Sequence, residues 1–92
     1  MAVSGYTIAV GSTATLIYRQ TKPTTGPVLI QNFDATNAIC IGGPDVSRTN
    51  YGHTVAKASG EQSLSISYGE EIWACSLAGA TPINVGILAV GV

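Results

Sequence analysis

The six residues Ser63-Leu64-Ser65-Ile66-Ser67-Tyr68 show most directly which fold this chain adopts. Leu64, Ile66 and Tyr68 alternate with three serines. Successive side chains of a β-strand point to opposite faces of a sheet, so the alternation predicts a strand with one face in the core and one in water. Apolar residues at helical spacing are sustained nowhere in the sequence, and we expect no substantial helix.

Segments of the same type lie on both sides of this stretch and are separated by turn residues such as Gly42-Gly43-Pro44. The seven further strand candidates are Tyr6–Val10, Ala14–Gln20, Val28–Phe33, Ala38–Ile41, His53–Lys57, Glu71–Ser76 and Ile83–Val90. This pattern predicts an all-β fold, namely a small antiparallel β-sandwich or barrel of about eight short strands. We expect one β domain over residues 1–92, with residues 1–5 able to serve as an N-terminal arm.

The composition indicates a folded protein that lies against other protein. Hydrophobic residues make up 46% of the 92 residues and charged residues 10%, whereas an average soluble domain carries about 25% charged residues. The net charge of −1 leaves no basic surface for nucleic acid. The longest apolar run, Pro82–Val92, is about half the length of a membrane-spanning helix, and the N-terminus has no recognisable secretion signal. We therefore expect neither nucleic acid nor a membrane as a partner.

Some strand candidates are apolar on both faces, which predicts cover from two sides. The residues expected in the core are Val28, Ile30, Leu64, Ile66, Ile72, Val85 and Ile87. A monomer would expose the apolar residues of the opposite faces, and self-association would hide them. The residues expected at an interface are Tyr6, Ile8, Val10, Leu29, Phe33, Trp73, Leu88 and Val90.

Residues with chemical reactivity are few and form no recognised catalytic motif. His53 is the only histidine and has no Gly-x-Ser-x-Gly elbow beside it, so a solvated or edge-strand histidine is favoured over a general base. Glu70 and Glu71 are adjacent, so on a strand their side chains diverge, and a turn with edge charges is the better interpretation. Gly42-Gly43-Pro44 lacks the Lys-Ser/Thr that follows in a phosphate-binding loop. We expect no catalytic residue, no cofactor and no enzymatic activity.

The two cysteines, Cys40 and Cys75, are expected to be reduced and buried. They lie 35 positions apart, and no His or further Cys stands at metal-ligand spacing. Both fall within strand candidates, and a reducing cytosol keeps thiols free. The sequence therefore predicts no metal site and no required disulfide.

Two features leave a binding function open. The stretch Asp45–Asn50 is the most polar of the chain, and loop carboxylates and amides can hold a sugar or an ion. Trp73 offers a ring on which a sugar can stack, although a core or interface anchor is the favoured role.

From Pro27 onward, the order of short motifs resembles a group of small virion proteins of tailed bacteriophages. The motifs are PVLIQN, AICIGGPDVS, a polar loop, SGEQSLSISYGEEIWACSLAGATP and a final INVGILAV strand, which together span about two thirds of the chain. In that group a strand ending in Ile-Gly-Gly precedes a polar loop, and a Gly-Glu turn introduces a serine- or leucine-rich strand. Cys40, Cys75 and Trp73 are not required by the pattern.

The resemblance implies a non-enzymatic virion structural protein of the head decoration (cement) type. Such a subunit is made in the host cytoplasm, lies on the capsid exterior, and binds and stabilises the assembled head. The partners expected are the major capsid protein and further copies of the chain, in a homotrimer that matches the local threefold junctions of an icosahedral lattice. The alternative is a carbohydrate- or receptor-binding module of a head fibre or tail structure. The family brings no catalytic residues to this sequence.

Overall fold

The computed structural model describes residues 3–21, 26–47, 49–77 and 82–90. These residues form eight strands and no helix, which confirms the all-β prediction. The strands are β1 (Val3–Val10), β2 (Thr15–Arg19), β3 (Gly26–Asn32), β4 (Ile39–Gly42), β5 (His53–Val55), β6 (Glu61–Ile66), β7 (Glu71–Ser76) and β8 (Ile83–Val90). Each overlaps one of the eight segments expected from the sequence. Among the described residues no helix is long and apolar enough to cross a membrane.

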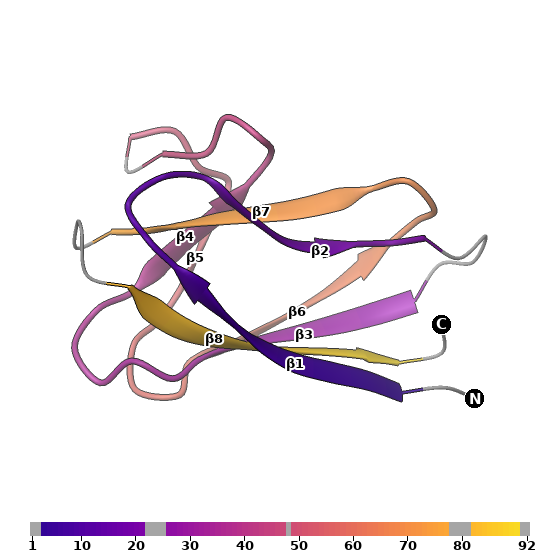
Figure 1. Cartoon of the computed structure of the whole chain (residues 1–92), viewed down its shortest axis with the longest axis horizontal. Helices are drawn as coiled ribbons and strands as arrows, with labels where there is room; N and C mark the ends of the chain where they lie inside the picture. The colour runs from indigo at the N-terminus through magenta and orange to yellow at the C-terminus, as the bar shows by residue number, and fades with distance from the viewer. Residues whose placement is uncertain (1–2, 22–25, 48, 78–81, 91–92) are drawn as a thin grey trace.

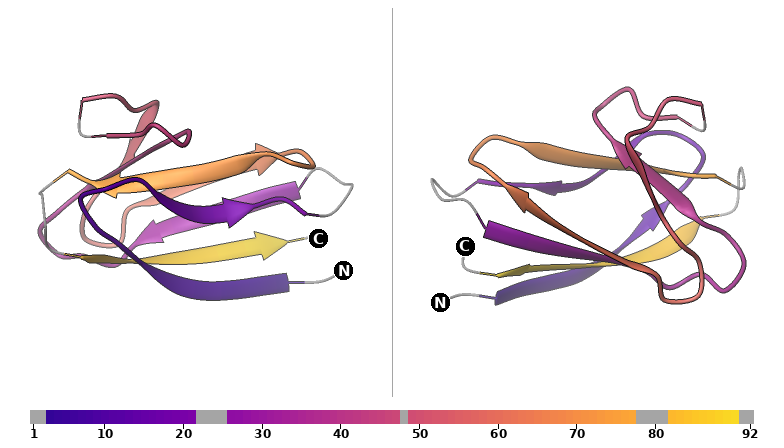
Figure 2. Two further views of the ribbon diagram at one scale, coloured as in Figure 1. Left: turned by 45° about the horizontal axis from the view of Figure 1, so that its top comes forward. Right: turned by 180° about the vertical axis from the view of Figure 1, so that it is seen from behind.

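The strands form two antiparallel sheets of four strands each, packed face to face as a small sandwich (Figure 1). We call β1-β8-β3-β6 sheet I and β2-β7-β4-β5 sheet II. The chain passes from β1 in sheet I to β2 in sheet II, and both views of Figure 2 show the two layers. In sheet I the first strand lies beside the last, since Val3 of β1 pairs with Val90 of β8.

The hydrophobic core lies between the inner faces of the two sheets. Six of the seven residues expected there are buried, and Leu64 is partly buried and packs against them. Val28 and Ile30 of β3 and Val85 and Ile87 of β8 alternate with outward-facing residues, as period two requires. Full burial of an aliphatic side chain stabilises a fold by about 1.5–3 kcal/mol. The aliphatic side chains buried between the two inner faces therefore hold the two sheets together.

Two sequence expectations about strand ends need correction. Tyr68 is 66% exposed and does not join the core, because β6 ends at Ile66 and the chain then turns. In that turn Gly69 has φ 86°, and the Glu70 N–H donates to the Ser67 carbonyl at 3.0 Å. Of the expected arm, residues 1–5, residues 3–5 form part of β1 and pair with residues 88–90 of β8, and residues 1 and 2 lie outside the described part of the chain.

Candidate interaction surface on sheet I

The outer face of sheet I carries the apolar residues that the core does not use. Leu29 of β3 pairs with Leu88 of β8, and Leu88 pairs in turn with Gly5 of β1. Phe33 follows directly after β3, where its backbone N–H donates to the Asn84 carbonyl at 3.0 Å. Phe33 is 49% exposed and Leu88 is 38% exposed. The sequence expectation that Leu29, Phe33 and Leu88 face away from the core therefore matches their positions.

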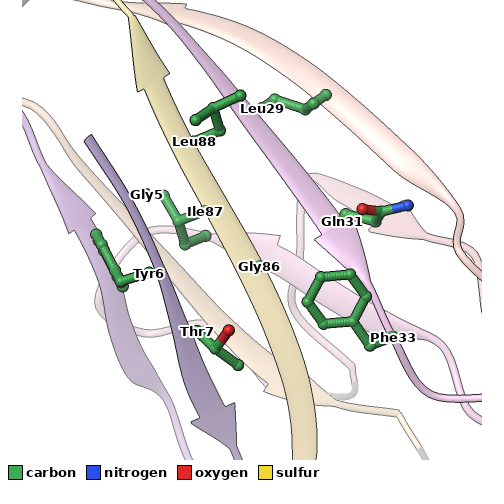
Figure 3. A pocket seen from close by; sticks show the side chains of 9 residues that line it. All are labelled: Gly5, Tyr6, Thr7, Leu29, Gln31, Phe33, Gly86, Ile87 and Leu88. Atoms are coloured by element: carbon green, nitrogen blue, oxygen red, sulfur yellow. The ribbon is translucent and has the colours of Figure 1, made fainter. Parts of the chain in front are cut away.

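These side chains surround a shallow hollow of about 390 Å³ (Figure 3). At its floor lies Gly86, in the middle of β8, with the ring of Phe33 against it. A Cβ atom at position 86 would come within 2.6 Å of the Phe33 Cζ atom, so glycine is what allows the ring to lie there. The lining residues are Gly5, Tyr6, Thr7, Leu29, Gln31, Phe33, Gly86, Ile87 and Leu88.

None of the described residues that line this hollow is charged. Its polar side chains are Thr7 and Gln31, and the Gln31 amide donates to the Ser59 carbonyl at 3.5 Å. The surface can therefore bury apolar area and accept a few neutral hydrogen bonds. Among its described lining residues, none carries a carboxylate, an imidazole, an amine or a thiol.

The three β1 residues expected at an interface occupy the inner side of sheet I. Val10 is fully buried in the core, which removes it from the candidate surface, and Ile8 is partly buried against the core. Tyr6 is 42% exposed, and its hydroxyl donates to the Ile17 carbonyl of sheet II. Partial burial, with Tyr18 nearby, raises the pKa of Tyr6. The side chain of Val90 lies outside the described part of the chain.

Trp73 lies on the opposite sheet and is separated from the hollow. It stands on the outer face of β7, partly buried beside a small cluster of Cys40, Val46 and Cys75. Its indole N–H donates to Glu71 Oε1 at 3.0 Å. This bond and the bond from Arg19, which forms an ion pair with Glu71 across β2 and β7, lower the pKa of Glu71.

The loop after β4 covers the outer face of sheet II. Val46 in this loop is only 4% exposed and packs on Cys40 and Cys75 of the strands below. The polar groups of the loop bond to one another: the Asn50 amide donates to Asp45 Oδ2 at 3.2 Å, and Ser47 and Asn50 exchange backbone hydrogen bonds. In the stretch considered as a sugar or ion site, Asp45, Ser47 and Asn50 are therefore engaged with one another, and Arg48 lies outside the described residues.

Cys40 and Cys75 are free thiols that lie opposite each other on β4 and β7. Both are fully buried, and the Cys40 thiol donates to the Cys75 carbonyl at 3.2 Å. Burial, followed by the neighbouring Cys75, raises the pKa of Cys40 to about 11. A protonated, enclosed thiol is a poor nucleophile and a poor metal ligand.

His53 lies exposed on β5, an edge strand of sheet II, as the sequence indicated. It borders a second hollow, of about 280 Å³, whose lining also includes Glu70, Glu71, Leu64 and Ile66. Within the described residues the side chain of His53 forms no hydrogen bond or ion pair. Glu71 is engaged by Arg19, and Glu70 accepts the Ser67 N–H at 2.5 Å. In that same part of the chain no three His, Cys, Asp or Glu residues are grouped so as to hold a metal ion.

A polar corner after β3 has a structural role. Asn32 is fully buried, and its amide donates to the carbonyls of Asn37 and Val55. The Asp34 carboxylate accepts the backbone N–H groups of Thr36 and Asn37, which lowers its pKa. These bonds hold the turn that leads from sheet I to sheet II.

Sequence reasoning missed two residues that shape these surfaces. Gly86 forms the floor of the first hollow, and a lone glycine inside an apolar strand is a recognised sign of close approach by another group. Val46 anchors the cover of sheet II, and it is the one aliphatic residue between Asp45 and Asn50. The glycine inside an apolar strand and the aliphatic residue inside a polar loop can both be seen in the sequence. Neither indicates which other segment of the chain packs against that residue.

No protein-family model matches this sequence, and no curated protein matches it either. The fold and the residues themselves therefore carry the functional conclusion.

Proposed function

We propose that this protein is a non-enzymatic structural subunit of a tailed-bacteriophage virion. In this proposal it is a capsid decoration subunit that is made in the bacterial cytoplasm and binds the outside of the assembled head. Its partners are the major capsid protein and two further copies of itself. It would stabilise the shell by bridging neighbouring capsid subunits.

The observation that carries the proposal is the outer face of sheet I, which no described segment of the chain covers. Leu29, Phe33 and Leu88 form an uncharged hollow on a chain of which 10% of the residues are charged. Apolar surface gathered on one face of a sheet is a common site of contact with other protein. The resemblance of the chain from Pro27 onward to small phage virion proteins is the reason for proposing a phage head as the assembly to which it binds.

The proposed mechanism is adhesive. Apolar area buried at a contact contributes about 25 cal/mol per Å², from which the loss of freedom on association is subtracted. Three weak contacts joined in one trimer bind a lattice far more tightly than one contact alone. A bound subunit stabilises the assembled shell because it binds the assembled state and not the dissociated one.

An electron cryomicroscopy map of the virion that encodes this chain tests the proposal. We expect density for the sandwich on the outside of the head, in groups of three at the local threefold positions. Density only in the tail, or none in the particle, would contradict a decoration role. A Leu88→Asp variant places a charge on the hollow and should lose trimer formation in light scattering, whereas Thr54→Asp on exposed edge strand β5 should not.

A glycan-binding module is the second candidate. The observation in its favour is the exposed Phe33 ring beside the Gln31 amide and the Thr7 hydroxyl in one hollow. This function predicts binding on a glycan array that is lost with Phe33→Ala. The decoration role predicts no glycan binding in the same assay.

A further inference from the structure

Sheet I ends in two edge strands, β1 and β6. In an antiparallel ladder, alternate residues direct their N–H and C=O groups to opposite sides of the strand. The Phe33 N–H donates to the Asn84 carbonyl, so Asn84 and every second residue of β8 from it direct their backbone N–H and C=O groups toward β3. The β8 residues between them direct these groups toward β1. Through the register of β1 with β8, the backbone groups of Gly5, Thr7 and Ala9 point away from the sheet.

Strand β6, at the other edge, also directs alternate backbone groups away from the sheet. The Asn32 N–H donates to the Gly60 carbonyl at 2.9 Å, so every second residue from Gly60 faces β3. The backbone groups of Glu61, Ser63 and Ser65 then point outward. The Ser63 carbonyl accepts the Gln62 amide at 3.1 Å and retains a second lone pair. Within the described residues no other strand pairs with either edge.

The edge at β1 lacks the features that usually prevent pairing. Soluble proteins protect edge strands by shortness, charge, proline or a bulge. Of the edge strands in sheet II, β5 has three residues, and β2 has five, with a register shift between Leu16 and Tyr18 and a terminal Arg19. Strand β1 has eight residues and carries neither charge nor proline, and it is paired with β8 along its full length without a register shift.

The edge at β6 borders apolar surface that the chain leaves partly open. The second hollow runs beside this strand, and Leu64, Ile66 and Ile72 contribute its apolar lining. Leu64 is only partly buried. The acidic residues beside this edge are Glu61 at the start of β6 and Glu70 and Glu71 in the hollow. Strand β1 carries no charge and therefore meets no electrostatic repulsion there.

We infer that β1 of one copy pairs antiparallel with β6 of the next copy, so that sheet I continues from subunit to subunit. The inference rests on the proposed self-association and names the surface that makes it. The directions agree, since β1 and β6 run antiparallel within one sheet. Placing Thr7 opposite Ser63 brings outward-pointing backbone groups together and keeps inner and outer faces in register.

This register also pairs side chains that are half-exposed in the single chain. On the inner side it sets Tyr6 beside Leu64 of the next copy, and each covers apolar surface of the other. On the outer side it sets the Thr7 and Ser63 hydroxyls within reach of a hydrogen bond. Pairing β1 with β1 would leave the hollow beside β6 uncovered, so the head-to-tail contact accounts for more of the surface.

A head-to-tail contact closes into a ring or grows into a filament. Sheet II packs on the inner face of sheet I, so a small ring can close only with the outer faces of sheet I toward its axis. Leu29, Phe33 and Leu88 of the three copies then face that axis. One six-residue pairing is smaller than a standard interface, but in a closed ring every subunit is held by two of them.

Proline substitutions at the two edges test this contact. Thr7→Pro and Ser63→Pro each remove an N–H that points away from the fold, a position at which edge strands tolerate proline. We expect the unaltered protein to sediment as three chains of 9.4 kDa and each variant as one. Mixing the two variants should restore one contact, between the intact β1 of Ser63→Pro and the intact β6 of Thr7→Pro, and give a 1:1 dimer. Thr54→Pro, on edge strand β5, is the matched control and should remain trimeric.

The outcomes separate the edge contact from the proposed function. If Ser63→Pro keeps the assembly that Thr7→Pro loses, β6 is not the acceptor and the inference fails. If both variants remain trimeric, or the unaltered protein is a monomer, the edges are not used, while binding to phage heads still tests the decoration role. Thr7→Lys and Ser63→Lys repeat the experiment with a charge at the edge should a proline variant fail to fold, as judged by circular dichroism.

Discussion

The two outer faces of the sandwich are built from strands of similar apolar content. One of them is covered by a loop of the same chain, and the other is exposed. The outer face of sheet II is closed by the chain itself, because the loop after β4 folds back and sets Val46 on Cys40 and Cys75. The outer face of sheet I has no such cover in the described residues, and Leu88 and Phe33 remain exposed around Gly86. An apolar outer face is thus not by itself a sign of an interface. The face that the chain leaves open is the one available to a partner.

The core between the inner faces of the two sheets is the reference for comparing the outer faces. A substitution there should have the largest effect on stability. Ile66→Ala removes a buried side chain of β6 and should lower the free energy of unfolding by about 2–5 kcal/mol. Ser65→Ala, one position away on the outer side, should change it by less than about 0.5 kcal/mol. Denaturant unfolding measures both. Equal effects at the two positions would show that the alternation of β6 has been assigned to the wrong faces.

The difference between the outer faces should appear as a difference in stability. Val46→Ala opens the cover of sheet II and should cost about 2 kcal/mol, from two lost methyl groups and the space they leave. Leu88→Ala on sheet I should cost less than about 1 kcal/mol in the single chain, since Leu88 is already partly in water. The measurement is urea unfolding at a concentration where the chain is monomeric. A larger cost for Leu88 would reverse the comparison.

The enclosed thiol beneath Val46 should make stability fall at alkaline pH. The pKa of Cys40 is raised from 9.0 to about 11, so between these values the unfolded chain loses a proton that the folded chain keeps. Stability is unaffected by this group below pH 9 and declines as the pH rises toward 11. Urea midpoints across this range should fall less steeply in Cys40→Ala. Tyr6→Phe is the companion variant, because the pKa of Tyr6 is raised as well. An unchanged slope in Cys40→Ala would mean that the thiol is open to water.

The smallest expected effect is the absence of a reaction. In the folded protein at neutral pH, iodoacetamide should leave the intact mass unchanged, because both thiols are fully buried and the reagent cannot reach them. After unfolding without reductant, two additions should appear. Val46→Ala should speed the modification of the folded form and Leu88→Ala should not. Protection of both thiols in the unfolded, unreduced chain would reveal a disulfide and overturn the prediction of free cysteines.

Much of the fold could be predicted from local pattern. Alternation in Leu64 and Ile66 and in Val85 and Ile87 identified strands and their inner faces, because a strand side chain has only two directions to choose from. The prediction that Tyr68 faces the core was wrong because the alternation of apolar residues continues into a turn. Gly69, with φ 86°, lies in that turn after the end of the strand. The sequence places Val10 on one side of a strand with Tyr6 and Ile8 and predicts an interface there, and only the position of Val10 over sheet II shows that it belongs to the core.

The sequence alone determined the all-β class, the approximate strand limits, the absence of a recognisable catalytic motif and the excess of apolar residues over what one core needs. Each of these properties depends on composition or on the pattern of neighbouring residues within one strand, and both can be read directly from the sequence. Only the tertiary structure decided which apolar face stays open, that Phe33 lies over Gly86 and that Val46 covers the cysteines. Those contacts join residues far apart in the chain, and their geometry depends on sheet order and register, which no local pattern encodes.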